Sequence, residues 1–166
     1  MAGNMFLKIE NPNVEGSSAD SSHAKQIQAL SWGHSFSQPT SPTRSSAGGG
    51  TVEQATHAPF SFTKYTDSAT DDLLKLHWSG KHIGKCTFYA YRADGNNKAV
   101  LYLQIDMEQV VISHFSVGGG AGDIPVENVS LNYGKVKYIY KGQKKEDGTA
   151  DGDQPVSHDL IKQEVE

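Results

Sequence analysis

The chain has little of what marks disulfide-stabilised, membrane-spanning or Sec-secreted proteins. Cys86 is the only cysteine, so no internal disulfide can form, which suits folding in a reducing cytoplasm. No apolar run approaches the ~20 residues that a membrane-spanning helix needs. The first residues contain no basic region followed by an apolar stretch, so we expect no Sec-type signal peptide. These absences predict a protein that is synthesised and folded in the cytoplasm.

Large apolar and charged side chains are both scarce. Leu, Ile, Val and Phe supply about one fifth of the 166 residues, close to the composition below which chains tend to stay disordered. Glycine is in surplus, with 17 residues. The formal net charge of −4 disfavours binding to a nucleic-acid backbone. We therefore expect a small core, many glycine turns and no nucleic-acid partner.

By composition, the chain consists of a main domain and two polar segments. Residues 141–166 carry seven acidic and four basic side chains, and we expect them to form an acidic, partly mobile C-terminal tail. Of the 17 residues in 35–51, 13 are Ser, Thr, Pro or Gly, a composition that cannot form a buried strand ladder. This segment is predicted to be disordered or to protrude as a loop. The domain itself is predicted to span residues 1–140.

Alternation of apolar and polar residues predicts strands through most of the body. The alternating stretches are residues 5–9, 25–36, 60–63, 82–92 and 99–117. The last of these exceeds the usual strand length, so we expect a bend near Glu108 and Gln109. One helix is predicted, capped by Ser68 or Thr70 and ended by Gly80. The predicted fold class is all-β: a two-sheet β-barrel with one short flanking α-helix and long protruding loops.

Gly134 interrupts the alternation within residues 126–141. The apolar residues before it are odd-numbered and those after it are largely even-numbered, as in Val129, Leu131, Val136 and Tyr138. A change of phase at a glycine is typical of a bulge or of a corner between two sheets. We therefore predict that Gly134 is a structural corner within one strand that serves both sheets.

Motifs for catalysis or cofactor binding are weak. The glycine cluster at residues 118–122 is followed by Asp123, Ile124 and Pro125 instead of the Lys and Ser/Thr of a phosphate loop, so it indicates a turn between strands. The seven histidines lack the spacing of a metal site. Cys86 lies on an apolar strand face, which favours a packed thiol over a nucleophile. We assign no catalytic, cofactor-binding or metal-binding residue.

Two alternative classes of function have candidate residues. Tyr89, Tyr91 and Arg92, together with the glycine loops, are candidates for a carbohydrate- or nucleotide-binding β-barrel module. Asp106 and Glu108 share a strand face and, with His114, are candidates for a small hydrolase. Packing of the aromatic residues and a solvent-facing acidic stripe are the simpler interpretations. Both alternatives predict a ligand pocket within one subunit.

Six sequence blocks, in order over nearly the whole chain, fit one family pattern. They are NMFLKIE (residues 4–10), SWGHS (31–35), FSFTKYTDSAT (60–70), LLKLHWSGKHI (73–83), YLQIDMEQVVISHFSVGG (102–119) and ENVSLNYGKVKYIY (127–140). Taken together, these blocks resemble the haemolysin-coregulated protein (Hcp) family of type VI secretion systems, and FTKY, SGKHI and ENVSLNYGKV are the most specific. Residues 56–59 and the acidic tail diverge from the family pattern.

The resemblance implies a structural subunit without enzymatic activity or a cofactor. Family members form homo-hexameric rings that stack into the inner tube of the secretion apparatus, below a spike protein and inside a contractile sheath. Contraction expels the tube, and its lumen can carry or chaperone effector proteins. The implied partners are further copies of the chain, the spike, the sheath and effectors, with no membrane span. The implied route is synthesis in the bacterial cytoplasm and secretion without a Sec signal into the medium or a target cell.

Assembly suggests roles for particular segments. A ring contact closes on itself, whereas a stacking contact repeats and builds a filament. We expect ring contacts along residues 99–117 and 126–141, and wet polar stacking contacts in the protruding loops. The stacking candidates are Ser41, Gly48, Gly49, Gly50, Gly119, Gly120 and Asp123. Ser31 is the candidate for contact with cargo in the lumen, and the alternative is that Ser31 merely packs beside its strand neighbours.

Overall fold

Strands dominate the structure, as the alternation predicts. The computed structural model describes residues 4–39, 55–93, 98–147 and 150–166. Within these ranges the elements are β1 (Met5–Glu10), β2 (Ile27–Gln28), β3 (Ser31–Gly33), β4 (Phe36–Ser37), β5 (Thr56–His57), β6 (Phe60–Tyr65), α1 (Thr70–Ser79), β7 (Ile83–Ala93), β8 (Ala99–Gly118), β9 (Val126–Asn132), β10 (Lys135–Gln143), β11 (Ala150–Asp159) and β12 (Glu164–Val165).

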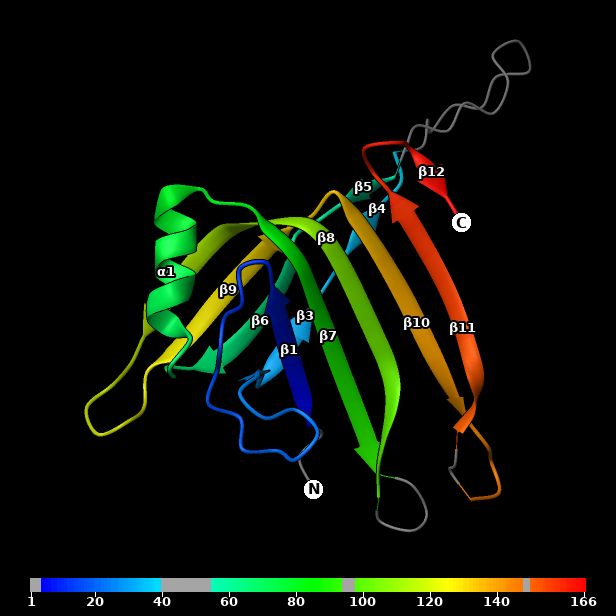
Figure 1. The fold of residues 1–166 in the computed structure, drawn as a ribbon, viewed down its shortest axis with the longest axis horizontal. Coiled ribbons are helices and arrows are strands. Elements are labelled where there is room, and N and C mark those ends of the chain that lie inside the picture. Colours follow the sequence, from blue (N-terminus) through cyan, green and yellow to red (C-terminus); the bar gives the residue numbers. More distant parts are fainter. Residues whose placement is uncertain (1–3, 40–54, 94–97, 148–149) are drawn as a thin grey trace.

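The strands form two antiparallel sheets that share β8 (Figure 1). The first sheet has the order β2-β1-β7-β8-β10-β11-β12, and the second has the order β3-β6-β9-β8. Strands β4 and β5 pair only with each other, and we call this pair the β4–β5 ribbon. The sheets curve strongly around one apolar core, with α1 packed against β8. The prediction of an all-β, two-sheet fold with one short flanking helix is confirmed.

The long strand β8 bends where the sequence analysis expects it to bend. Its first half pairs with β7 and β10, and its second half, from Val111, pairs with β9. Between the halves, Gln109 has a φ of 53°, a left-handed conformation that few residues other than glycine adopt. One continuous strand thereby contributes to both sheets.

Residues 126–141 differ from the prediction of one strand that serves two sheets. They form two strands: β9 belongs to the second sheet and β10 to the first. Gly134 lies between them, and a Cβ atom there would lie 2.9 Å from both Gln109 Oε1 and Ile161 Cδ1. At this crossing the backbone passes close to the bend of β8, where the Gly134 N–H donates a hydrogen bond to the Glu108 carbonyl at 3.0 Å. That the fold requires glycine at this position stays a prediction.

The acidic C-terminal segment contains strands that its composition does not predict. Strand β11 pairs with β10 from Lys135↔Asp159 to Gln143↔Ala150, and β12 pairs with the end of β11. The predicted boundary at residue 140 falls inside β10, so the segment continues the first sheet. Backbone hydrogen bonds form this ladder, and they do not need the apolar side chains that the sequence analysis looked for. The predicted mobility of the segment is a separate property and stays a prediction.

Helix α1 begins differently from the prediction. Its N-cap is Ala69, which makes no side-chain capping bond, and Asp67 Oδ1 instead accepts a hydrogen bond from the Ala69 N–H at 3.0 Å. The helix ends at Gly80 with a φ of 64°, as predicted. Leu73 and Leu76 are the buried residues that attach the helix to the core.

Candidate functional site

Ser31 lies on the exposed face of the second sheet. Its partner across the β3–β6 pair is Thr63, and the two hydroxyl oxygens are 2.5 Å apart. The next residue along β3, Trp32, points to the other side, where it stacks on Phe60 and makes a tilted ring contact with Phe88 in the core. Successive residues of a strand point to opposite faces of the sheet. Because the bulky side chain of Trp32 points into the core, the small side chain of Ser31 points outward.

The strand register extends this face into two rows of residues without carboxylate, ammonium or guanidinium groups. Residues directly opposite each other in neighbouring strands point to the same side of a sheet, so paired residues form rows. The rows are Ser31, Thr63, Asn128 and Ser116, and Gly33, Ser61, Ser130 and His114. We call these eight residues the hydroxyl face.

The hydroxyl face is polar without carrying a carboxylate, an ammonium or a guanidinium group. Its hydroxyl and amide groups can each both donate and accept a hydrogen bond, so they contact many protein surfaces equally well. Some of this capacity is satisfied internally, since Ser61 Oγ lies 2.9 Å from Ser130 Oγ. Such a surface suits wet, weak and unspecific contact more than a single tight ligand. Sequence reasoning found only Ser31, because the other members become neighbours through a strand register that one sequence does not reveal.

A buried charge cluster supports the far end of the same sheet. The side chains of Lys64 and Glu127 are both 0% exposed, and Lys64 Nζ lies 3.1 Å from Glu127 Oε1 and 2.8 Å from Asp67 Oδ1. Thr70, the first residue of α1, donates a hydrogen bond to Glu127 Oε2 at 2.8 Å. The cluster therefore fastens β6, β9 and the start of α1 to one another, and its charges are paired as burial requires.

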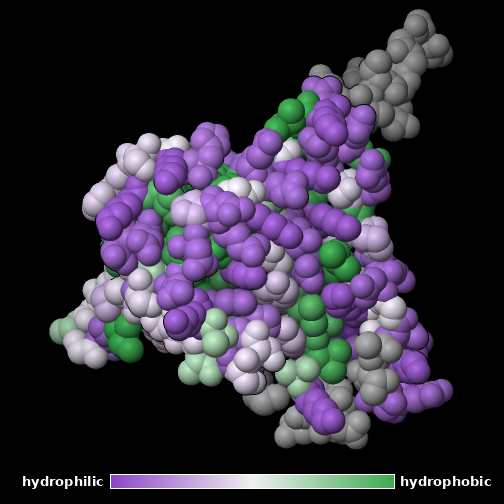
Figure 2. Space-filling model, viewed as in Figure 1, coloured by the Kyte–Doolittle hydropathy of each residue, from purple (hydrophilic) through white to green (hydrophobic). Residues whose placement is uncertain are grey.

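The predicted stacking residues fall in two places. Gly119, Gly120 and Asp123 lie in the exposed loop between β8 and β9, which protrudes at the lower left of Figure 1. Ile124, in the same loop, is 61% exposed, and hydrophobic residues interrupt the hydrophilic surface over this hairpin in Figure 2. The other candidates, Ser41, Gly48, Gly49 and Gly50, lie outside the described residues. No finding tests the stacking role of either group, which stays a prediction.

The structure brings together two of the candidates for a carbohydrate or nucleotide site, since Tyr89 and Tyr91 both pack against His23, with ring centroids 4.8 and 5.1 Å from it, but the other candidates lie apart from them. Tyr91 packs edge-on against Phe6, and its hydroxyl bonds to His23 Nε2. The guanidinium of Arg92 lies over the ring of Tyr102, 5.1 Å from its centroid. These residues lie beside the start of β8, whereas the loop with Gly119 follows its end.

The candidates for a hydrolase also lie apart. Asp106 and Glu108 lie on β8, which pairs with β7 on one side and β10 on the other. In this register, Glu108 lies between Lys85 and Lys135. His114 lies beyond the bend of β8, on the hydroxyl face. Asp106 lies between Thr87 and Lys137 in the same register and accepts a hydrogen bond from the Gln104 amide at 3.0 Å, so neither carboxylate is placed beside the histidine.

Cys86 is a packed thiol, as the sequence analysis interpreted it. The side chain is fully buried in the core, and burial raises its pKa to about 12, so the nucleophilic thiolate is disfavoured at neutral pH. In the described ranges, no group of three or more His, Cys, Asp or Glu residues is placed to hold a metal ion. No helix of the described part of the chain is long and apolar enough to cross a membrane.

Comparison with known proteins agrees with the resemblance. The family model of the type VI secretion system effector Hcp matches residues 6–140. Protein hcp1 of Pseudomonas aeruginosa is 39% identical over 153 residues, which are 92% of this chain and 91% of that protein. The crystal structure of Hcp1 from Salmonella typhimurium is similar over the full length of both chains, with a TM-score of 0.78 and 25% identity. A further structure, of a type six secretion system protein, has a TM-score of 0.88 over 99% of this chain and all of its own, and its 23% identity shows the fold alone. The chain therefore belongs to the Hcp family of type VI secretion system effectors.

Proposed function

We propose that the chain is the subunit of a type VI secretion inner tube. Its copies form homo-hexameric rings, the rings stack into a tube, and the hydroxyl face lines the lumen. The hydroxyl face is the observation that carries this proposal. It is a hydrogen-bonding surface without carboxylates, ammonium or guanidinium groups on one side of a curved sheet, whereas a small-molecule site is usually lined mainly by apolar side chains.

Such a lining suits a conduit for effector proteins. Carboxylates or ammonium groups on a channel wall would hold cargo of one charge and repel cargo of the other. Hydroxyl groups exchange hydrogen bonds with water and with cargo at little net cost, so a passenger is held weakly and released. Ser31 and Thr63 are the residues that we place in contact with effectors.

Exposed apolar side chains at the β8–β9 loop support burial of this loop in an assembly. Val117 and Ile124 are each 61% exposed beside the β8–β9 loop. Large apolar residues gathered on a surface commonly mark contacts with other proteins. We place stacking contacts in this loop, at Gly119, Gly120 and Asp123, and in residues 35–51. Ring contacts then bury the long strands β8 and β10.

Under the same proposal, the chain is a structural subunit of the secretion apparatus and does not catalyse a reaction. The spike sits on one end of the tube, the contractile sheath surrounds it, and effectors occupy the lumen. Contraction carries the subunit out of the bacterial cytoplasm into the medium or a target cell, without a Sec signal.

Two measurements on the full chain test the proposal. Light scattering after size-exclusion chromatography is expected to give six times the chain mass of 18.0 kDa. In a bacterium with the secretion apparatus, the protein is expected in the medium only when the sheath gene is intact. A monomer at all concentrations, or release that does not depend on the sheath, contradicts the proposal.

A further inference from the structure

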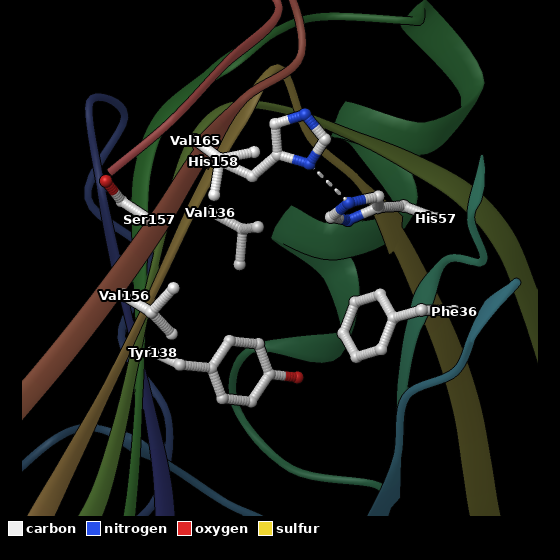
Figure 3. Close-up of a pocket in the computed structure, with 8 residues that line it drawn as sticks. All are labelled: Phe36, His57, Val136, Tyr138, Val156, Ser157, His158 and Val165. Atoms are coloured by element: carbon white, nitrogen blue, oxygen red, sulfur yellow. Dashed lines mark hydrogen bonds between the residues drawn. The ribbon is translucent and has the colours of Figure 1, made fainter. Parts of the chain in front are cut away.

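Five titratable side chains meet between the β4–β5 ribbon and the first sheet. Three of them, His57, Tyr138 and His158, line a pocket of about 310 Å³ together with Phe36, Ser157 and three valines (Figure 3). The five side chains are His34, His57, Tyr133, Tyr138 and His158, and we call them the histidine–tyrosine chain. The sequence analysis missed them because they come from five separate places along the polypeptide.

Hydrogen bonds join these side chains end to end. Tyr138 bonds to Nδ1 of His34. Nε2 of His34 lies 2.7 Å from the Tyr133 hydroxyl and 3.1 Å from the carbonyl oxygen of Ala58. The same Tyr133 hydroxyl lies 2.7 Å from Nδ1 of His57, whose Nε2 lies 2.8 Å from Nδ1 of His158 (Figure 3).

The histidine–tyrosine chain is the main polar attachment of the ribbon. The ribbon has two residue pairs, Phe36↔His57 and Ser37↔Thr56, and a backbone hydrogen bond from the Ala58 N–H to the Ser35 carbonyl links it to the neighbouring β3–β6 pair of the second sheet. Neither of its strands pairs with a strand of the first sheet. Its other attachment is aromatic: Phe36 packs against His34 and Tyr138, although 51% of it remains exposed. Side chains, not a backbone ladder, therefore hold the ribbon against the first sheet.

One arrangement of protons satisfies the whole set, and in it every histidine is neutral. The Ala58 carbonyl can only accept, so His34 carries its proton on Nε2 and accepts from Tyr138 at Nδ1. Tyr133 then donates to Nδ1 of His57, and His57 donates from Nε2 to His158. A proton added to Nδ1 of His158 turns this last contact into two opposed N–H groups. Charging both His57 and His158 places two cations in contact.

No described carboxylate faces the histidines to stabilise a positive charge. His158 is paired with Val136 on β10 and with Val165 on β12, so these neighbours share its side of the sheet. The charged residues next to them along the strands lie on the opposite side: they are Lys135, Lys137, Asp159 and Glu164. Asp159 is moreover engaged with the backbone N–H groups of Ile161 and Lys162, at 3.0 Å each. The titratable groups that face the histidines are thus Tyr133, Tyr138 and one another.

Burial of the imidazoles also favours their neutral form. It lowers the pKa of His34 to about 4, and burial together with the charge of His158 lowers the pKa of His57. A histidine that is neutral when docked and free to bind a proton when released makes docking weaker in acid. The docked state keeps its full stability above the ordinary histidine pKa of about 6.5 and loses it as the pH falls from there toward 4.

We propose that the histidine–tyrosine chain is an acid-released latch that holds the β4–β5 ribbon on the first sheet. Each imidazole that is released takes one proton from solvent, and the resulting cations cannot re-form the neutral chain of hydrogen bonds. The ribbon brackets residues 40–54 in the sequence, which include the stacking candidates Ser41 and Gly48. Acid therefore also loosens ring stacking, a consequence that rests on the proposed function.

Hydrogen exchange of the full chain at pH 7.5 and pH 5.0 tests the latch. After correction for intrinsic exchange, the opening constant of the ribbon peptides (residues 33–39 and 55–59) is expected to rise on the order of tenfold in acid. Peptides from β6 and β9 in the same sample are expected to keep their protection. The exchange reads the ribbon whether or not tubes form, so a failure of the latch is distinguishable from a failure of the proposed function.

Two variants and one titration decide the outcome. His57→Gln removes a titrating group of the latch and is expected to reduce the acid response, whereas His82→Gln, at an exposed histidine after α1, is expected to leave it unchanged. If His57→Gln does not fold, NMR titration of the wild-type imidazoles still decides the matter. Ribbon protection that is equal at both pH values, or His34 and His57 titrating near pH 6.5 with the ribbon docked, overturns the proposal.

Discussion

The hydroxyl face and the β4–β5 ribbon are both polar surfaces, but different interactions hold them. Backbone ladders fix the hydroxyl face, and its back is the apolar core with Phe62 and Val129. The ribbon has two residue pairs of its own and depends on His34 and His57 for its polar attachment. A surface held by backbone bonds does not depend on the protonation of its side chains, whereas one held by imidazoles does. We therefore expect the structure of the hydroxyl face to be independent of pH and the attachment of the ribbon to weaken in acid.

The largest effect is expected where the second sheet depends on buried charge. Lys64→Met leaves Glu127 buried without its cation, and we expect a loss of about 3–5 kcal/mol in the free energy of unfolding, measured by urea denaturation. Lys64→Met combined with Glu127→Leu removes both charges and is expected to recover much of that loss. A double variant as unstable as the single one would show that the pairing is not what stabilises this end of the sheet.

A smaller loss is expected at the crossing between the two sheets. The added side chain of Gly134→Val meets Gln109 and Ile161, so we expect overpacking to cost about 1–3 kcal/mol and to lower the melting temperature by several degrees. Gly33→Val is the matched control, because a Cβ at Gly33 has no atom within 4 Å. Equal melting temperatures for the two variants would contradict the assignment of Gly134 as the corner.

A still smaller effect on stability is expected from a substitution in the attachment of the ribbon. Tyr133→Phe removes the hydroxyl that joins His34 to His57, and we expect the ribbon to lose about 1 kcal/mol of local stability. Hydrogen exchange of residues 55–59 measures this loss, with Tyr140→Phe, at an exposed tyrosine, as the control. Unchanged exchange in Tyr133→Phe would mean that the aromatic contacts of Phe36 suffice.

The smallest effect on stability is expected on the hydroxyl face, where the effect on cargo is largest. Ser31→Trp points into solvent, so we expect a change within about 0.5 kcal/mol in the free energy of unfolding. Co-purification of an effector with the ring is nevertheless expected to fall, because the indole narrows the lumen. Ser22→Trp, at an exposed serine outside this face, is the control, and an equal loss of effector in both would contradict the assignment of Ser31.

The sequence predicts the local structure well where side-chain alternation is strong. The bend of β8 follows from the length of its alternating stretch, and the helix at residues 70–79 follows from the spacing of its apolar residues. The exposure of Ser31 does not follow from alternation, because Ile27 and Ala29 alternate in step with it and are buried, whereas Leu30 is 42% exposed. Strand β11 does not follow from alternation either, because its residues carry acids and glycines and its order comes from backbone pairing with β10. The division of residues 126–141 into two strands likewise depends on the close approach of Gly134 to another segment.

Two features of the sites show what one sequence can and cannot reveal. Lys64 follows Phe60 and Phe62 on the buried side of its strand, so a charged residue on an apolar face was a readable sign of a buried partner. The histidine–tyrosine chain gives no such sign. His57 and His158 are 101 residues apart in the sequence, and only the packing of the ribbon beside β11 brings them into contact.

Electron cryomicroscopy of the assembled full chain tests the central claim most directly. We expect closed rings in which Ser31, Thr63 and Asn128 face the central channel, with the histidine–tyrosine chain away from the lumen wall. Rings whose channel is lined by another surface, or a chain that forms no ring, would contradict the account.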